Sequence, residues 1–411
     1  MRVDAGRLLC EGEPVRAKGS IPVWAFVAAG WLAAFLPLAL AGRGGLWPPA
    51  TPAQPAGVDL ALMLDYSRAW LATGNPFAGL NPYPPLAAVL FAPLAGLPFA
   101  VAYGIVAALT VAAFVSVVAA LPLLAFPRAD RAAVLLAALA GTLSYGLWYE
   151  LRWGQFNVLA LAAAAWGAFL FHRGRGRGAR WAAYALFSAG IQLKLYPALC
   201  VFLFARDARA WKETLARWAA LGAANGALLF ALGPRAFADF LHSLRAQAAA
   251  PYVWAGNHSL QSFAAWAGWP RLAPALFAAF AACLAVALWR AARRPGRAAC
   301  MDLALVCALG TMLVPGVSHD YKLVAFPLAF AAFVGAAEPL ARRGVRAAGG
   351  FLALCGLEAW TLFSLAAKPP AVQNAAPFLL AACGVLALGA APAASGRRAE
   401  TDPRAAGGIT V

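Results

Sequence analysis

Long apolar runs separated by short polar segments make up most of the chain. A helix that crosses the hydrocarbon core of a bilayer needs about 20 predominantly apolar residues. The pattern therefore predicts an all-α polytopic membrane protein with about ten transmembrane helices. The predicted crossing runs are 21–42, 100–126, 131–149, 155–172, 218–233, 271–290, 299–316, 322–341, 347–366 and 374–393.

Two further apolar runs, 84–98 and 181–204, do not have the pattern of a single crossing helix. The first is short and rich in proline, and the second is interrupted by Gln192, Lys194 and Pro197. We expect both runs to be re-entrant, dipping into the membrane and returning, or to lie at its interface. Irregular backbone at membrane depth is tolerated only where protein or a water-filled cavity surrounds it. Both runs are therefore predicted to line a cavity.

The composition excludes an ordinary soluble protein, since 63% of the residues are hydrophobic and only 12% are charged. Soluble domains carry roughly a quarter charged residues. We predict one membrane domain over 21–393, a cytoplasmic tail over 1–20 and a disordered cytoplasmic tail over 394–411. The seven cysteines show no metal-binding spacing and mostly lie in apolar runs, so we interpret them as small packing residues.

The net charge of +17 is concentrated on one side of the predicted membrane. Segments on the side of the N-terminus hold 24 lysines and arginines, against 8 on the other side. By the positive-inside rule the first side is cytoplasmic, and both termini with it. The charge thus has an explanation that needs no nucleic acid partner. The two longest loops, 43–83 and 234–270, face outward, so we expect the site on the extracytoplasmic face of the cytoplasmic membrane.

Carboxylates in the first outer loop are candidates for proton transfer. Asp59 and Asp65 are six positions apart, so they fall on different faces of a helix. We expect one to be a site residue and the other a solvated charge. Lys194 lies in the middle of an apolar run, where a lysine costs several kcal/mol, so we interpret it as functional, with phosphate as a suitable partner. The alternative is a snorkelling or carboxylate-paired lysine.

Polar residues also gather where the predicted helix at 155 begins. Gln155 and Asn157 occupy its first turn, and Arg152 lies just before it. Amides and neighbouring indoles suit contacts with a sugar or a phosphate. They equally suit helix capping and an aromatic belt at the membrane interface, and both interpretations stay open.

Two outer turns contain two of the four histidines. One turn has Asn257 and His258, and the other has His319, Asp320 and Lys322. His319 and Asp320 suit an acid–base pair or an interfacial polar turn. No HxxxH or DxD pattern accompanies them, so no metal site is predicted. The sequence indicates no cofactor and leaves use of a divalent metal open.

Several short motifs together resemble glycosyltransferase family 87, the polyprenyl-phosphate-mannose-dependent mannosyltransferase type with the GT-C architecture. They occur in the family's order between about residues 58 and 325. The motifs are Asp59 followed by GNP at 74–76, YPPL at 83–86, GQFN at 154–157, KLYP at 194–197, NHSLQ at 257–261 and SHDY at 318–321.

The resemblance implies a hexosyltransferase that uses a polyprenyl-phosphate sugar, with mannose as the family's best-known hexose, and a lipid or glycan acceptor among membrane lipids. It makes Asp59 the catalytic carboxylate. Asp65 is the fallback, because Ala61, Leu62 and Met63 replace the family's usual aromatic pair, and Phe77 stands where tyrosine is common. The implied donor-binding residues are Tyr83, Arg152, Gln155, Asn157, Lys194, Asn257, His258, His319, Asp320 and Lys322.

Two other classes of protein use the same lipid-linked sugars. One is a transporter or flippase, and the other is a polysaccharide polymerase or ligase. Transporters often have internal repeats with paired broken helices. Both irregular runs lie in the first half of this chain and differ in sequence, so the pattern favours the transferase.

Overall fold

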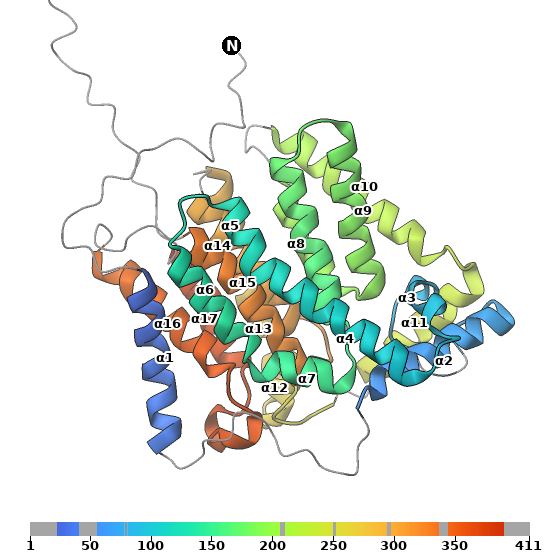
Figure 1. Ribbon diagram of the computed structural model, residues 1–411, viewed down its shortest axis with the longest axis horizontal. Helices are drawn as coiled ribbons and strands as arrows, with labels where there is room; N and C mark the ends of the chain where they lie inside the picture. The colour runs from blue at the N-terminus through green and yellow to red at the C-terminus, as the bar shows by residue number, and fades with distance from the viewer. Residues whose placement is uncertain are drawn as a thin grey trace, which may run out of the picture.

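The computed structural model describes residues 23–40, 56–77, 79, 81–205, 210–249, 252–293, 297–336 and 344–389. The described part of the chain is helical and contains no strand, only an isolated bridge between Asn257 and His319 (Figure 1). This confirms the all-α class. The predicted tails 1–20 and 394–411 lie outside the described residues.

Each of the ten predicted crossing runs contains a helix. Apolar side chains dominate these runs, so a helix is the conformation that satisfies their backbone groups internally. The helices are α1 Val23–Leu40, α4 Phe99–Val115, α5 Leu121–Ala125, α6 Arg131–Thr142, α8 Asn157–Arg173, α10 Trp211–Leu229, α13 Ala273–Arg293, α14 Arg297–Leu313, α15 Ala325–Ala336, α16 Gly344–Trp360 and α17 Ala376–Leu388.

By length and composition, two helices of the described part are suited to cross a membrane alone. One is Phe99–Ala125, in which a π-helical stretch, η3 Ser116–Ala120, joins α4 to α5. The other is Pro270–Arg293. The number is up to four if each of two bent helix pairs is one span: α6 with α7 Tyr145–Trp153 at 44°, and α10 with α11 Pro234–Ala249 at 102°. The chain is a membrane protein, and the count of about ten crossings stays a prediction.

The run predicted as one helix over 131–149 is in fact divided. Helix α6 ends at Thr142, and the hydroxyl of Ser144 accepts a hydrogen bond from the Leu147 amide at 3.3 Å, which caps α7. The segment 234–270, predicted as an outer loop, likewise contains two helices, α11 and α12 Leu260–Trp266. The charged residues of α11 interrupt the apolar pattern, so the sequence does not predict this helix.

Helices α8 and α9 Arg177–Leu193 pack in close contact. Glycine allows this approach, since a Cβ at Gly190 would lie 2.6 Å from the Ala160 carbonyl oxygen. A Cβ at Gly167 would lie 2.8 Å from the Ala183 carbonyl oxygen. Any larger residue at either position would push the two backbones apart.

The run 181–204 folds as a hairpin. Helix α9 stops before Lys194, and a 3₁₀ helix, η4 Tyr196–Phe204, continues the chain. The Tyr196 hydroxyl bonds Asn157 at the start of α8, whereas the Leu203 carbonyl lies 2.7 Å from the His172 ring at its end. The hairpin therefore begins and ends beside the C-terminal end of α8. Lys194 lies at its tip, near the N-terminal end of α8.

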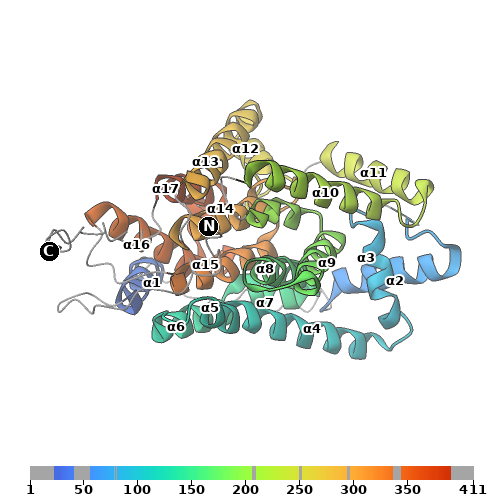
Figure 2. The same cartoon turned by 90° about the horizontal axis from the view of Figure 1, so that it is seen from above.

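The run 84–98 is also irregular. It contains α3 Pro85–Phe91, of seven residues, and the 3₁₀ turn η2 Ala92–Leu94, which is too little helix to cross a bilayer. It packs on α2 Val58–Thr73, where the Ser67 hydroxyl donates to the Ala88 carbonyl at 2.8 Å. Helices α2, α3 and α11 lie together at one end of the molecule in both views (Figures 1 and 2).

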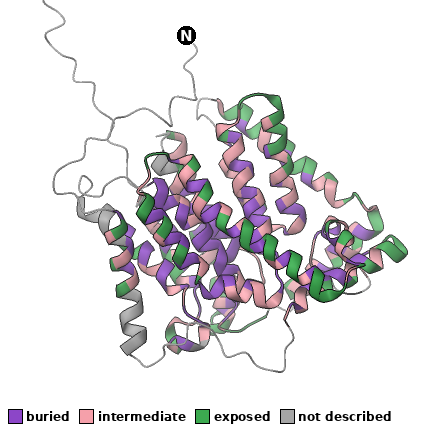
Figure 3. Cartoon of the chain, in the orientation of Figure 1, coloured by how far each residue is buried: buried purple, intermediate pink, exposed green. Residues whose placement is uncertain are grey.

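Buried residues concentrate in the centre of the molecule, where α14 and α15 pack together, and exposed residues lie on the outer helices (Figure 3). Helix α4 exposes large apolar side chains, including Val101, Ile105 and Leu109. An apolar surface of this kind faces lipid in a membrane protein. Outside that surface, α2, α7, α11 and the two outer turns surround the candidate site.

Candidate functional site

A cavity of about 480 Å³ opens where α2, α7, α11 and the two outer turns meet. Its wall is mainly aromatic, with a few polar groups. The lining residues are Asp59, Leu62, Tyr66, Pro82, Tyr83, Tyr149, Trp153, Gln155, Ser243, Ala246, Gln247, Tyr252, Trp254, Val317, His319 and Tyr321. A concave site with aromatic walls and few polar groups is typical of small-molecule binding.

Two glycines bring Asp59 to this cavity. Gly57 precedes α2, Gly154 ends α7, and both have positive φ, 80° and 65°, which glycine adopts without strain. A Cβ on Gly154 would lie 2.9 Å from the Gly57 Cα, and the Gly57 amide donates to the Arg152 carbonyl at 2.8 Å. The start of α2 is thus held against the α7–α8 junction.

Gln155 connects the carboxylate to a buried ammonium. Its Nε2 donates to Asp59 Oδ2, and its Oε1 accepts from the Lys194 Nζ at 2.7 Å. An ammonium only donates and a carboxylate only accepts, so the two charges together fix the orientation of the amide. Lys194 also lies over the rings of Tyr83 and Phe156, at 4.2 and 4.4 Å from their centres.

The environment of Asp59 suits a proton acceptor. Burial raises the pKa of this carboxyl above its usual value, and the Gln155 hydrogen bond and then the Lys194 charge oppose the rise. A general base works best when its pKa lies near the working pH.

Asn157 lies behind the cavity wall. Its amide donates to the buried Glu150 at 2.6 Å, and its carbonyl accepts from the Tyr196 hydroxyl at 2.5 Å. The second Glu150 oxygen accepts from the Val158 amide at the start of α8, at 2.9 Å. A carboxylate at a helix N-terminus satisfies free amides there and is stabilised by the helix dipole. These contacts hold the Gln155 segment in place.

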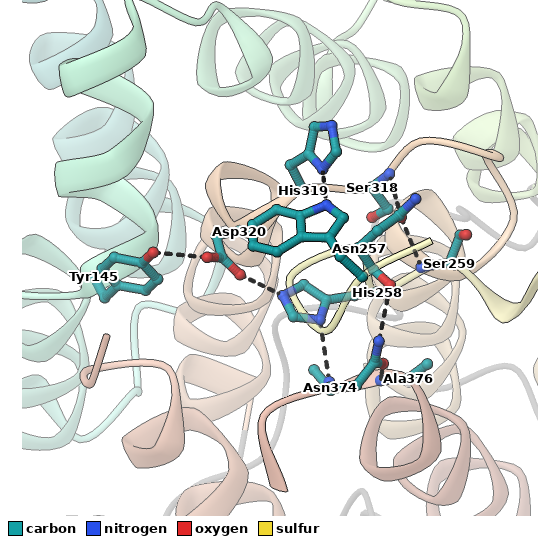
Figure 4. Close-up of polar contacts among 11 residues, drawn as sticks. Tyr145, Asn257, His258, Ser259, Ser318, His319, Asp320, Asn374 and Ala376 are labelled. Carbon is teal, nitrogen blue, oxygen red and sulfur yellow. Dashed lines mark hydrogen bonds and ion pairs between the residues drawn. The ribbon is translucent and has the colours of Figure 1, made fainter. Parts of the chain in front are cut away.

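Asp320 and His258 form a buried pair rather than a cavity wall (Figure 4). His258 Nε2 lies 2.8 Å from Asp320 Oδ1, and the Tyr145 hydroxyl donates to Asp320 Oδ2 at 2.7 Å. The Ala375 amide donates to His258 Nδ1 at 3.1 Å, so the ring proton is on Nε2 and points at Asp320. The pair links α7, the two outer turns and the start of α17.

Asn257 joins the two outer turns. Its Oδ1 accepts from the Ser318 amide at 2.8 Å, and its Nδ2 donates to the carbonyls of Tyr252 and Gly316 at 2.8 and 3.1 Å. A fully buried amide that bonds the backbone in this way rigidifies the loops around it. Its contacts hold the neighbouring His319 turn at the cavity.

His319 is the histidine that reaches the cavity. The Trp254 indole donates to its Nδ1 at 3.2 Å, which leaves the ring proton on Nε2. Burial, followed by the charge of Lys322, lowers the pKa of His319 to about 4. The ring is therefore neutral at physiological pH and acts as a hydrogen-bond donor through Nε2.

The predicted site residues fall into three groups. Asp59, Tyr83, Gln155 and His319 line the cavity. Asp65 does not, and forms an exposed pair with Arg68 at 2.7 Å. The other seven predicted residues do not line the cavity. Arg152 is half-buried. The remaining six are buried: Asn157, Lys194, Asn257, His258, Asp320 and Lys322.

Most of the cavity wall could not be predicted from the sequence. Ser243, Gln247 and Tyr252 belong to no motif, and Trp254 precedes one. Tyr149 and Trp153 lie in the aromatic segment for which a membrane belt and a sugar contact were both open, and they line the cavity. A high density of aromatic residues in two outer segments was the available signal. Within the described ranges, no group of three or more His, Cys, Asp or Glu is arranged to hold a metal ion.

Comparison with known proteins gives one match. Residues 81–315 match the family model described as glycosyltransferase family 87. No curated protein and no solved structure matches the chain. The matched region includes Gln155, Lys194 and α11, and the motifs at Asp59 and His319 lie on either side of it.

Proposed function

The chain belongs to glycosyltransferase family 87, and from that we propose that it transfers a hexose, mannose first among them, from a polyprenyl-phosphate donor to a hydroxyl group of a lipid or glycan acceptor. The reaction is proposed for the extracytoplasmic face of the cytoplasmic membrane, because the charge bias along the chain favours that side for the loops of the site.

The observation that carries the proposal is the Asp59–Gln155–Lys194 chain of hydrogen bonds in the wall of an aromatic cavity. A carboxylate is available for the acceptor, and a fixed positive charge lies behind it. Aromatic rings and amides suit the apolar faces and hydroxyl groups of sugars. The lipid-facing surface of α4 offers an apolar environment for a prenyl chain.

The proposed chemistry is a direct displacement at the anomeric carbon. Asp59 takes the proton of the acceptor hydroxyl, whose oxygen forms the new bond to that carbon. The bond between the carbon and the phosphate oxygen breaks, and its electron pair leaves with the polyprenyl phosphate. Neutral His319 donates a hydrogen bond from Nε2 that positions one of the reacting groups.

Positive charge near the cavity stabilises the departing phosphate. Lys194 acts through the Gln155 amide, which it bonds at 2.7 Å. Lys322 is buried, lies over the Tyr196 ring at 4.5 Å and donates to the carbonyl of Val317, a cavity residue, at 2.5 Å. Arg152 carries a third positive charge, in the segment whose backbone accepts from the Gly57 amide at 2.8 Å. Fixed charges of this kind act without reorganisation during the reaction.

The test uses purified Asp59→Asn protein in liposomes supplied with polyprenyl-phosphate mannose. Asparagine preserves the shape of the side chain and removes the base, so we expect transfer to fall by about 10²–10⁴-fold. Asp65→Asn is the matched control and should transfer normally. Full transfer by Asp59→Asn would remove this residue from the mechanism. A wild-type protein that moves the donor across the membrane without releasing free polyprenyl phosphate would be a flippase.

A further inference from the structure

One part of the cavity wall takes no part in the proposed chemistry. Helix α11 contributes Ser243, Ala246 and Gln247, and the segment that follows contributes Tyr252 and Trp254. The sequence motifs include none of these residues. This part of the wall, defined by the five residues, is the α11 wall.

The two aromatic residues of the α11 wall are exposed, and hydrogen bonds hold their segment of the chain. Tyr252 is 57% exposed and Trp254 is 38% exposed. The Tyr252 carbonyl accepts two hydrogen bonds, from Asn257 Nδ2 and Ser262 Oγ, both at 2.8 Å. Because exposed aromatic surface on a fixed backbone loses little entropy on binding, it suits a ligand.

Trp254 is held from two sides. Its indole donates to His319, and its ring lies against Gly256, where a Cβ would come within 2.3 Å of the ring. The Tyr252 and Trp254 rings both flank His319, with centres 5.5 and 5.6 Å from the imidazole. The α11 wall is therefore continuous with the residue that reaches the reacting groups.

Gln247 is the polar group of the α11 wall that is suited to a ligand. Ser243, one turn earlier on the same face of α11, donates to the Asp239 carbonyl at 3.0 Å and accepts from the Asn81 amide at 3.2 Å. Ser243 thereby joins α11 to the α2–α3 loop. The Gln247 amide contributes donors and an acceptor to the cavity.

These groups match a saccharide ring. A hexose presents C–H groups on its faces and hydroxyl groups around its edge, so it stacks on aromatic rings and bonds an amide. None of the described residues in the α11 wall carries a charge. That composition disfavours a phosphate, which requires arginine, lysine or a cluster of amides.

The position of α11 separates this surface from the lipid. Helix α11 is bent by 102° from α10 and carries Arg235, Asp239, His242 and Arg245 within its 16 residues. Charged side chains at this density belong in the aqueous or headgroup layer. A donor must place its prenyl chain in lipid, so a water-facing subsite is better suited to the other substrate.

We propose that the α11 wall is the acceptor subsite and that it binds a saccharide ring of the acceptor, stacked on Tyr252 and Trp254 and hydrogen-bonded to Gln247. This assignment rests on the proposed transferase function. It defines the acceptor as a glycan or glycolipid with a terminal sugar, rather than a lipid alcohol without one.

The test measures two Michaelis constants with purified full-length protein in nanodiscs. The donor is polyprenyl-phosphate mannose, and the acceptor probe is an alkyl mannoside. Tyr252→Ala and Gln247→Ala should each raise the acceptor KM by about tenfold and change the donor KM by less than about threefold. The matched controls are His242→Ala, exposed on the same helix, and Trp269→Ala, a 68% exposed aromatic outside the cavity. Both controls should behave as wild type.

Direct binding of the alkyl mannoside, measured by calorimetry without donor, separates this proposal from the proposed function. Binding by wild type that is weakened by about tenfold in Tyr252→Ala supports the subsite even if no transfer occurs. An unchanged acceptor KM and unchanged binding in both variants would overturn it. A larger rise in the donor KM than in the acceptor KM would also overturn it, because the α11 wall would then bind the donor.

Discussion

Replacing Lys194 by methionine tests the link between the buried ammonium and Asp59. Methionine keeps most of the length of the side chain and removes its charge. The Gln155 amide loses the hydrogen bond of 2.7 Å that fixes its orientation. The NH₂ group still donates to Asp59, which only accepts, but the amide oxygen keeps only the longer contact from Asn157 Nδ2, at 3.4 Å.

The size of the effect follows from the geometry. A side-chain amide with a hydrogen bond at each end separates the ammonium from the carboxylate by no more than about 8 Å. Two unit charges at that distance interact by about 2 kcal/mol at an effective dielectric constant of about 20. That energy corresponds to about thirtyfold in the proton affinity of the carboxylate.

The assay is the pH dependence of hexose transfer. Asp59 must be deprotonated to act as a base, so activity rises as the pH passes its pKa, which burial already places above the usual value. Removal of Lys194 raises that pKa further, and the acid limb of the profile moves to higher pH. Lys212→Met, on the surface of α10, should leave the limb in place. A limb that stays in place or moves to lower pH in Lys194→Met would refute the electrostatic link.

Three further predictions concern the frame of the site. Asp320→Ala leaves the buried His258 and Tyr145 without their acceptor and should destabilise the protein by about 3–5 kcal/mol, measured as a lower Tm in detergent. The exposed control Asp65→Asn should cost less than about 1 kcal/mol. Equal losses of Tm in the two variants would contradict the burial argument. Gly190→Ala places a methyl group 2.6 Å from backbone and should cost about 1–3 kcal/mol, whereas Gly222→Ala, with open space around it, should not lower the Tm. His319 has a pKa lowered to about 4, so acidification from about pH 6.5 to 4 favours the unfolded state, and His319→Gln should lose less Tm over that range than wild type. An identical loss in both proteins would exclude His319 as the titrating group.

The helices were predictable because a crossing run differs so strongly from a loop in its apolar content. The two irregular runs were also identifiable, since proline and a mid-run Lys194 disrupt the pattern. The bend after Thr142 was missed because a serine cap inside an apolar run changes its hydropathy very little. Helix α11 was missed for the opposite reason, as its charged residues resemble those of a loop.

The arrangement of the site was less accessible from the sequence. Asp59 and Gln155 both stood out, but their hydrogen bond depends on a contact between Gly57 and Gly154, which no local pattern encodes. His258 was expected among the donor-binding residues, and tertiary packing makes it the buried partner of Asp320. Tyr252 has no local signal at all, because its importance comes from the cavity that distant segments enclose.

The two sides of the cavity are synthesised at different times. Asp59, Gln155 and Lys194, with the rings that surround the ammonium, all precede residue 200, and their hairpin is complete at Phe204. The α11 wall follows, and His319 comes only after α14. Since segments of a membrane protein are inserted in chain order as they leave the ribosome, the carboxylate and its cation are assembled before the surface assigned to the acceptor exists. Once Phe204 has left the ribosome the chain contains the charged half of the site, and the cavity wall is complete only when the turn at His319 follows.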